Sequence, residues 1–137
     1  MTGSCLIPTL RYRDAPAMIA WLRDAFGFEK RMVVDGENGT IAHAQLTFGN
    51  AMIMLSSERG DDDFGQLQAP PDTPSSRVTQ SPYIIVSDVD ALCDRAGAAG
   101  AAVVLGPNDE DYGGRGFSCR DPEGHLWNFG SYDPWAE

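Results

Sequence analysis

Basic residues are scarce in this chain of 137 residues, and so are long apolar runs. Ten Lys and Arg residues stand against twenty Asp and Glu residues, which gives a formal net charge of -10. Such a surface repels phosphate backbones, so we expect no nucleic-acid partner. No run of about 18 apolar residues occurs, and the N-terminus lacks a basic region followed by an apolar stretch. We therefore expect no membrane partner and a cytoplasmic location.

Cysteine is equally sparse. The three cysteines, Cys5, Cys93 and Cys119, form neither a CxxC metal pair nor an even disulfide set. Free cysteine in an apolar setting usually behaves as a small hydrophobic residue. A reducing compartment, the cytosol, fits this pattern best.

The first half of the chain combines strand-like and helix-like patterns. The strand-like stretch "CLIPTLRYR" precedes "DAPAMIAWLRDAFG", whose apolar residues recur at helical spacing. Asp14 is placed to cap this helix and Gly27 to end it. Three further strand patterns follow: "FEKRMVVD", "GTIAHAQLTFG" and "AMIMLSS". The predicted order is strand, helix, strand, strand, strand.

The same order returns after residues 58–80, which are rich in Asp, Gly, Pro and Ser and read as a linker or mobile loop. "SPYIIVS" predicts a strand, "DVDALCDRAGAAG" a helix, "AAVVLGP" a strand and "GRGFSCRDPEGHLWNFG" a hairpin. We interpret the chain as one α+β domain with two tandem βαβββ repeats. The repeats span about 4–57 and 81–132.

Two motifs carry a resemblance to a known family. "DPEGHLWNFG" resembles the closing hairpin "DPxGNxxEF" of the vicinal-oxygen-chelate superfamily, and "LRYRDAPAMIAWLRDAFGFE" supports the match. This superfamily includes glyoxalase I, bleomycin-resistance proteins, fosfomycin-resistance transferases and extradiol dioxygenases. The resemblance implies that the two repeats form an open, incomplete barrel with a central cavity. It also implies that enzymes of the family hold a metal there with ligands from four strands.

Carried over to this sequence, the four ligand positions fall on Ile7, Met54, Ser81 and Asn128. Ile7 has no lone pair, Met54 is a soft thioether, and the remaining two offer neutral oxygen atoms. Divalent metals need imidazole, thiolate or carboxylate ligands, and no negative charge remains in this set. We therefore predict no metal and no other cofactor.

The two histidines do not restore a metal site. His43 lies in a strand pattern of small residues, where a lone histidine is more often a surface or inter-strand partner than a ligand. His125 shares the phase of Trp127 and Phe129, opposite to Asn128, which places it on the helix-facing side of the sheet or at its rim.

Strand alternation predicts which side chains line the implied cavity, because residues two apart share a face. The candidate ligand-binding residues are Thr9, Arg11, Met54, Ser56, Tyr83, Tyr112 and Asn128. Arg11 either anchors an anionic group of a ligand or pairs with an internal carboxylate. Tyr112 lies on a glycine-flanked loop, where its ring either closes over a ligand or pins the loop.

The sequence favours a binding protein of the bleomycin-resistance type. Such a protein sequesters a small-molecule ligand, aromatic or cationic, in a metal-free cavity and protects against an antibiotic or toxin. The alternative is a glyoxalase-like or dioxygenase-like enzyme that uses a displaced metal or a metal-free acid–base site. Either form is expected to be a homodimer, because a domain of this size leaves apolar strand faces uncovered.

The substituted ligand positions give a first prediction. Protein purified in metal-supplemented medium should contain no stoichiometric divalent metal, because Ile7, Met54, Ser81 and Asn128 supply no anionic ligand. Elemental analysis measures this directly. A content of about one zinc, nickel, manganese or iron atom per chain would contradict it.

Overall fold

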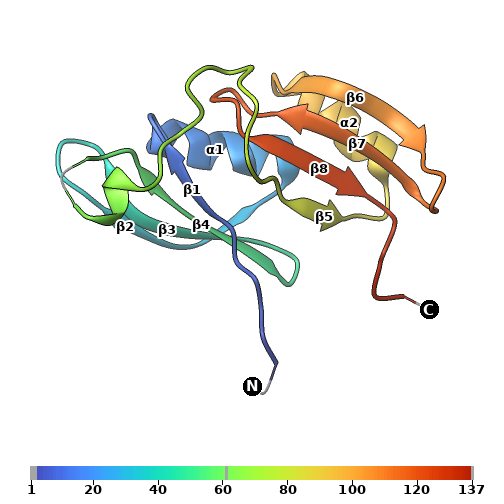
Figure 1. The fold of residues 1–137 in the computed structure, drawn as a ribbon, viewed down its shortest axis with the longest axis horizontal. Coiled ribbons are helices and arrows are strands. Elements are labelled where there is room, and N and C mark those ends of the chain that lie inside the picture. Colours follow the sequence, from blue (N-terminus) through green and yellow to red (C-terminus); the bar gives the residue numbers. More distant parts are fainter. Residues whose placement is uncertain (1–2, 61, 137) are drawn as a thin grey trace. The chain divides into compact units, whose positions relative to one another are not determined.

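The computed structural model describes residues 3–60 and 62–136. The chain divides into two compact units, Met1–Arg23 with Gly27–Pro70, and Asp24–Phe26 with Pro71–Glu137. Each unit contains one four-stranded sheet, whose strands can be followed in Figure 1. The expected α+β class and the two βαβββ halves are confirmed.

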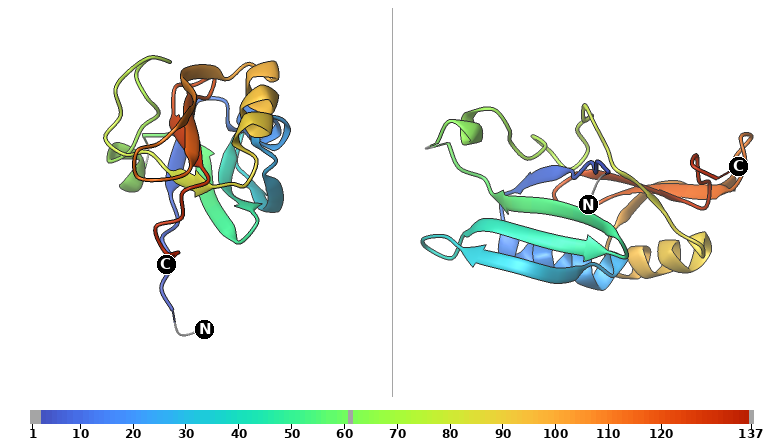
Figure 2. Two further views of the ribbon diagram at one scale, coloured as in Figure 1. Left: turned by 90° about the vertical axis from the view of Figure 1, so that its right-hand side faces the viewer. Right: turned by 90° about the horizontal axis from the view of Figure 1, so that it is seen from below.

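The first unit follows the predicted order of elements. These are β1 (Thr9–Tyr12), α1 (Ala15–Phe26), β2 (Glu29–Asp35), β3 (Ile41–Phe48) and β4 (Ala51–Ser57). The strands lie in the order β1-β4-β3-β2, with β1 parallel to β4 and the other pairs antiparallel. The sheet is open, with β1 and β2 at its edges (Figure 2).

Helix α1 begins and ends where the sequence predicted. The Asp14 carboxylate accepts a hydrogen bond from the Ala17 amide at 3.2 Å, which satisfies one of the free donors of the first turn. Gly27 ends the helix with φ of 92°, a left-handed conformation that a residue with a Cβ rarely adopts.

Strand β4 shows how the first sheet separates its two faces. Ile53 and Leu55 are buried, at 3% and 2% exposure, whereas Met52, Met54 and Ser56 are half-buried. Alternate side chains of a strand point to opposite faces, so these three residues share the open face of the sheet. The predicted phase of this strand is correct.

The second unit repeats the arrangement. Its elements are β5 (Tyr83–Ile85), α2 (Val89–Ala98), β6 (Ala102–Asp109), β7 (Arg115–Arg120) and β8 (Leu126–Gly130). The strand order is β5-β8-β7-β6, which matches the first sheet position for position. Among the described residues, no helix is long and apolar enough to cross a bilayer.

Aromatic rings form the core of the second unit. Phe26, from the last turn of α1, lies 4.8 Å from Phe129 and 5.3 Å from Trp127 between ring centroids. Phe117 stacks on Phe129 at 5.2 Å. Trp127 and Phe129 are both buried, at 0% and 1% exposure, so both serve packing.

Residues 58–80 are more ordered than the composition suggested. A short 3-10 helix, η1 (Phe64–Gln66), lies in this stretch. In the first unit, the Gln68 side chain donates to the Thr9 carbonyl at 2.8 Å. In the second, the Arg120 guanidinium donates to the Ser76 carbonyl at 2.7 Å. The stretch is therefore hydrogen-bonded to a strand in each unit, and its role as a linker or mobile loop stays a prediction.

A buried carboxylate holds the closing hairpin. Asp121 is 2% exposed, and its Oδ1 accepts backbone hydrogen bonds from Glu123 and His125, each at 3.0 Å. Its Oδ2 accepts from Trp127 Nε1 at 3.1 Å. Gly124 completes the turn with φ of 98°, and a Cβ there would lie 2.8 Å from the backbone of residues 73 and 74. The "DPEG" motif is thus a structural turn.

Removing this carboxylate should destabilise the fold. Asp121→Ala leaves three buried or half-buried donors without their acceptor, so we expect a loss of about 3 kcal/mol in the free energy of unfolding. Urea denaturation followed by tryptophan fluorescence measures the loss. Asp72→Asn, an exposed carboxylate in the same unit, is the control and should change stability by less than about 0.5 kcal/mol. Equal stability of the two variants would show that the turn does not depend on Asp121.

Candidate ligand-binding faces

The open face of the first sheet brings together four of the predicted residues. Thr9 of β1 is the register partner of Met54 on β4, and Arg11 is the partner of Ser56. Directly paired residues on neighbouring strands share a face, so these side chains form two adjacent rows. Their role in ligand binding stays a prediction.

Arg11 is more buried than strand alternation suggests. It is 5% exposed, and its Nη1 donates to the Ser57 carbonyl at 3.1 Å. The guanidinium carbon lies 5.2 Å from the centre of the Phe64 ring, a cation–π distance. The segment 58–68 therefore covers this part of the open face.

The covering segment carries its own polar anchor. Asp62 accepts a 2.6 Å hydrogen bond from the Gly65 amide, which is the main reason that the pKa of this carboxyl lies below its ordinary value. Burial opposes this shift, and the positive charges of Arg59 and Arg11 add to it. Asp62 also pairs with Arg59 at 3.0 Å. This turn fixes the position of Phe64 above Arg11.

His43 lies on the open face of the first sheet, which its sequence pattern did not predict. Gln45 of β3 is the register partner of Met54, and His43 lies two residues earlier on the same face. The Gln45 amide nitrogen lies 3.2 Å from His43 Nε2. The two side chains are therefore within hydrogen-bond distance.

The open face of the second sheet centres on Asn128. Tyr83 of β5 is its register partner on one side and Ser118 of β7 on the other. The amide nitrogen donates to Ser81 Oγ at 2.8 Å and to the Pro82 carbonyl at 3.0 Å. The amide oxygen accepts from Ser118 Oγ at 2.7 Å. Asn128 is therefore held at both ends by the protein itself.

These contacts test whether the ligand positions fit a divalent metal. In the second unit, Ser81 and Asn128 hydrogen-bond to each other, and neither supplies a charge. In the first, Ile7 and Met54 supply no oxygen, imidazole or thiolate donor. Within residues 3–60 and 62–136, no three His, Cys, Asp or Glu side chains gather as a metal cluster. The residues present do not fit the metal that the superfamily's enzymes use.

Three tyrosines meet at one end of the second sheet. The Tyr83 hydroxyl donates to the Tyr132 carbonyl at 2.7 Å, and the rings of Tyr112 and Tyr132 meet edge to face with centroids 4.9 Å apart. We call Tyr83, Tyr112 and Tyr132 the tyrosine cluster. Burial raises the pKa of Tyr83, and the neighbouring Tyr112 hydroxyl adds to the rise.

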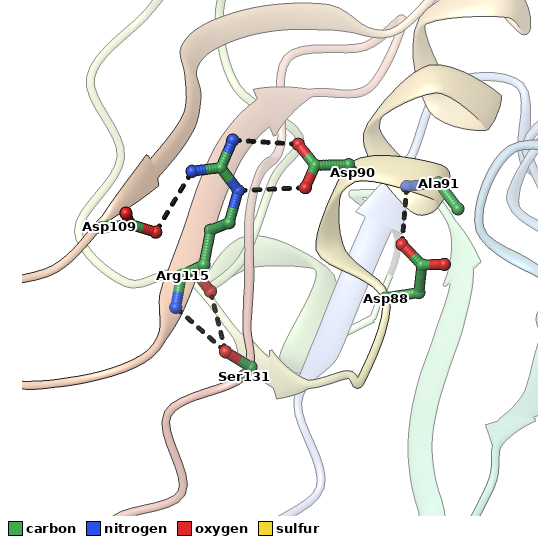
Figure 3. A network of polar contacts seen from close by, with 6 residues as sticks. All are labelled: Asp88, Asp90, Ala91, Asp109, Arg115 and Ser131. Carbon is green, nitrogen blue, oxygen red and sulfur yellow. Dashed lines mark hydrogen bonds and ion pairs between the residues drawn. The ribbon is translucent and has the colours of Figure 1, made fainter.

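Arg115 fixes the hairpin that carries Tyr112 (Figure 3). Its guanidinium forms a two-pronged pair with Asp90 of α2, at 3.0 and 3.1 Å, and also donates to Asp109 at 3.2 Å. Its backbone amide donates to Ser131 Oγ at 2.9 Å. The hydrogen bonds from Arg115 hold the pKa of Asp90 below its ordinary value. Helix, hairpin and the segment after β8 are thus tied together beneath the tyrosine cluster.

Comparison with known proteins agrees with this geometry. The sequence profile of the Glyoxalase/Bleomycin resistance protein/Dioxygenase superfamily matches residues 6–129, nearly the whole chain. The chain belongs to this superfamily. The resemblance seen in the motifs "DPEGHLWNFG" and "LRYRDAPAMIAWLRDAFGFE" is therefore confirmed.

Individual superfamily members resemble the chain along its length. The uncharacterised protein Rv0887c of Mycobacterium tuberculosis is 33% identical over 125 residues, covering 91% of this chain and 72% of the relative. The crystal structure of TioX from Micromonospora sp. ML1 is 33% identical, with a TM-score of 0.71, and the match covers 93% and 98% of the two chains. The fosfomycin resistance protein FosX of Listeria monocytogenes shares the fold at 16% identity, with a TM-score of 0.68 over 100% and 97%.

Some residues on the two open faces were not predicted from the sequence, although the sequence contains a signal for one of them, Ser118. Counting outward from the "DPEG" turn pairs Ser118 with Asn128, as the hairpin register shows. No such count finds Tyr132 or Glu110, because they approach the cluster from a tail and from a hairpin tip. Of the predicted residues, Tyr83, Asn128 and Tyr112 do come together in the second unit.

The buried contacts of Arg11 lead to a test of its role. Arg11→Met keeps the apolar stem but removes the hydrogen bond to Ser57 and the cation over Phe64, so we expect a loss of about 2 kcal/mol in stability. Hydrogen exchange should accelerate across residues 58–68, which the contact holds down. Urea denaturation and exchange mass spectrometry measure the two effects.

Arg31→Met is the matched control, because Arg31 is an exposed arginine on β2, outside the covering segment. It should leave exchange across residues 58–68 unchanged. Normal stability of Arg11→Met combined with lost ligand affinity would instead assign Arg11 to ligand recognition alone.

Proposed function

We propose that this protein binds and sequesters a small organic molecule on the open sheet faces, without metal chemistry and without a cofactor. The observation that carries the proposal is the hydrogen bonding of the Asn128 side chain. The amide occupies a position where the superfamily's enzymes hold a metal-binding carboxylate, and its donor and acceptor are both committed to Ser81, Pro82 and Ser118. A side chain held in this way presents a fixed polar group to a ligand.

The composition of the two faces supports a ligand more than a catalytic centre. Met54 and Leu126 supply half-buried apolar surface, and Ile85 is 44% exposed. A few fixed polar groups, such as Asn128, lie among them. Small-molecule sites usually combine a mainly apolar lining with few oriented polar groups.

The proposal includes a homodimer in the cytoplasm. Edge strand β2 exposes Met32, Val33 and Val34, and edge strand β6 exposes Val103, Val104 and Leu105, between 37% and 66%. Apolar edge strands tend to pair with another chain, and a second copy is the nearest partner of suitable chemistry. A dimer would withdraw these side chains from water.

Protection against a toxic compound is the proposed consequence of sequestration. FosX of Listeria monocytogenes, whose fold this chain shares, is a fosfomycin resistance protein. At 16% identity that likeness concerns the fold alone. Binding without turnover would protect a cell in proportion to the amount of protein present.

Native mass spectrometry against a library of small aromatic, cationic and anionic compounds tests the proposal. We expect a dimer that takes up a ligand of unchanged mass, because Asn128 and the tyrosine cluster offer binding groups but no reactive centre. Tyr83→Leu should weaken the complex about tenfold by removing an exposed ring from the face. Asp72→Asn should not.

Two results would contradict the proposal. A chemical change in the bound compound would indicate the alternative, an enzyme with a metal-free acid–base site. A monomeric protein that takes up no library member would contradict both the dimer and the sequestering function.

A further inference from the structure

The second sheet has two paired glycines next to the tyrosine cluster. Gly116 of β7 and Gly130 of β8 are register partners, so two paired positions carry no side chain. A Cβ on Gly130 would lie 2.6 Å from the Tyr83 hydroxyl, so the glycine is what allows that ring to lie across the strand. Gly130 is buried beneath the ring and Gly116 is half-buried, so the floor of this patch is the backbone at Gly116 and its wall is the Tyr83 ring.

A carboxylate reaches the same floor. Glu110 Oε1 lies 3.8 Å from the position that a Cβ on Gly116 would take. Glu110 is half-buried, and the ion pairs found among the described residues leave it without a cation. The nearby guanidinium of Arg115 is already paired with Asp90 and Asp109. Within the described part of the chain, no ion pair therefore offsets the Glu110 carboxylate at the edge of this floor.

Further negative charge surrounds the tyrosine cluster. Asp111 adjoins Tyr112 in the hairpin tip, and the charge of Asp133 contributes to the raised pKa of Tyr83, which places it close to that ring. Tyr112 is 61% exposed and Tyr83 is 42% exposed, so their rings remain open to a ligand. Aromatic faces and carboxylates both attract positive charge.

We infer that the tyrosine cluster, with the backbone at Gly116 and the Glu110 carboxylate beside it, is a binding site for an organic cation. The cation is either an alkylated ammonium or a planar ring over which the charge is spread. This inference rests on the proposed small-molecule-binding function and specifies its ligand class. A compact, strongly hydrated ammonium gains less from an aromatic wall, because it must lose its water first. A neutral ligand would bury Glu110 without compensation, and an anion would be repelled.

The probe pair is N-methylacridinium, a planar cation, and acridine at mildly alkaline pH, where it is uncharged. Isothermal titration calorimetry should show the cation binding at least about tenfold more tightly than the neutral compound, since both have similar area. Tyr112→Leu should weaken cation binding about fivefold, whereas Tyr112→Phe, which keeps the aromatic face, should stay close to the natural protein.

Glu110→Gln tests the charge without removing an aromatic contact. We expect it to weaken cation binding about fivefold and to leave acridine binding unchanged. Asp72→Asn, which removes one exposed carboxylate elsewhere in the same unit, is the control for the general acidity of the chain. Urea denaturation checks that each variant is folded. If Tyr112→Leu does not fold, Glu110→Gln still tests the inference.

Three outcomes would overturn the inference. Equal binding of acridine and N-methylacridinium would leave a small-molecule site but not a cation site, so the proposed function would survive. Equal weakening by Glu110→Gln and Asp72→Asn would show unspecific attraction to an acidic protein. No binding of either probe would remove the cation site, while uptake of other compounds in the library screen decides the proposed function separately.

Discussion

The buried carboxylate of Asp121 is the constraint on which the second sheet depends. Its two oxygens accept hydrogen bonds from Glu123, His125 and the Trp127 indole, so the turn and the first core residue of β8 are fixed together. Once Trp127 points into the core, alternation sends Asn128 to the open face. A buried carboxylate is tolerated only because both of its oxygens accept hydrogen bonds. The turn cannot rearrange without breaking several of these hydrogen bonds at once.

The two units share a backbone plan but present different chemistry. In the first, a cation, Arg11, lies beneath Phe64 and donates to the Ser57 carbonyl, so its charge is covered by the chain itself. In the second, Gly130 lets the Tyr83 ring lie across β8, and that ring stays 42% exposed. Tandem repeats of one fold can therefore offer a closed polar contact in one half and an open aromatic one in the other.

The sequence predicted what depends on local periodicity and missed what depends on distant contacts. Helix caps such as Asp14 and the alternation around Met54 follow from neighbours in the chain, and both were correct. The predicted first strand began too early, because Pro8 precedes Thr9 and has no N–H to donate to a ladder. The predicted strand at Tyr83 ran too far, because β8 ends at Gly130, the partner of Ile85. The cover over Arg11 comes from residues more than fifty positions away, in a stretch without periodicity, so no local signal reports it.

Period-two alternation also explains how this fold can exist without the superfamily's metal ligands. Trp127 and Asn128 are adjacent in sequence, yet one is fully buried in the aromatic core and the other faces the open side. Changing the outward residue leaves the core packing of its neighbours intact, so stability and chemistry are set by separate residues on one strand. An amide at position 128 removes a metal donor while Ser81 and Ser118 satisfy its polar atoms. The residue on the open face can therefore change while the hairpin held by Asp121 stays the same.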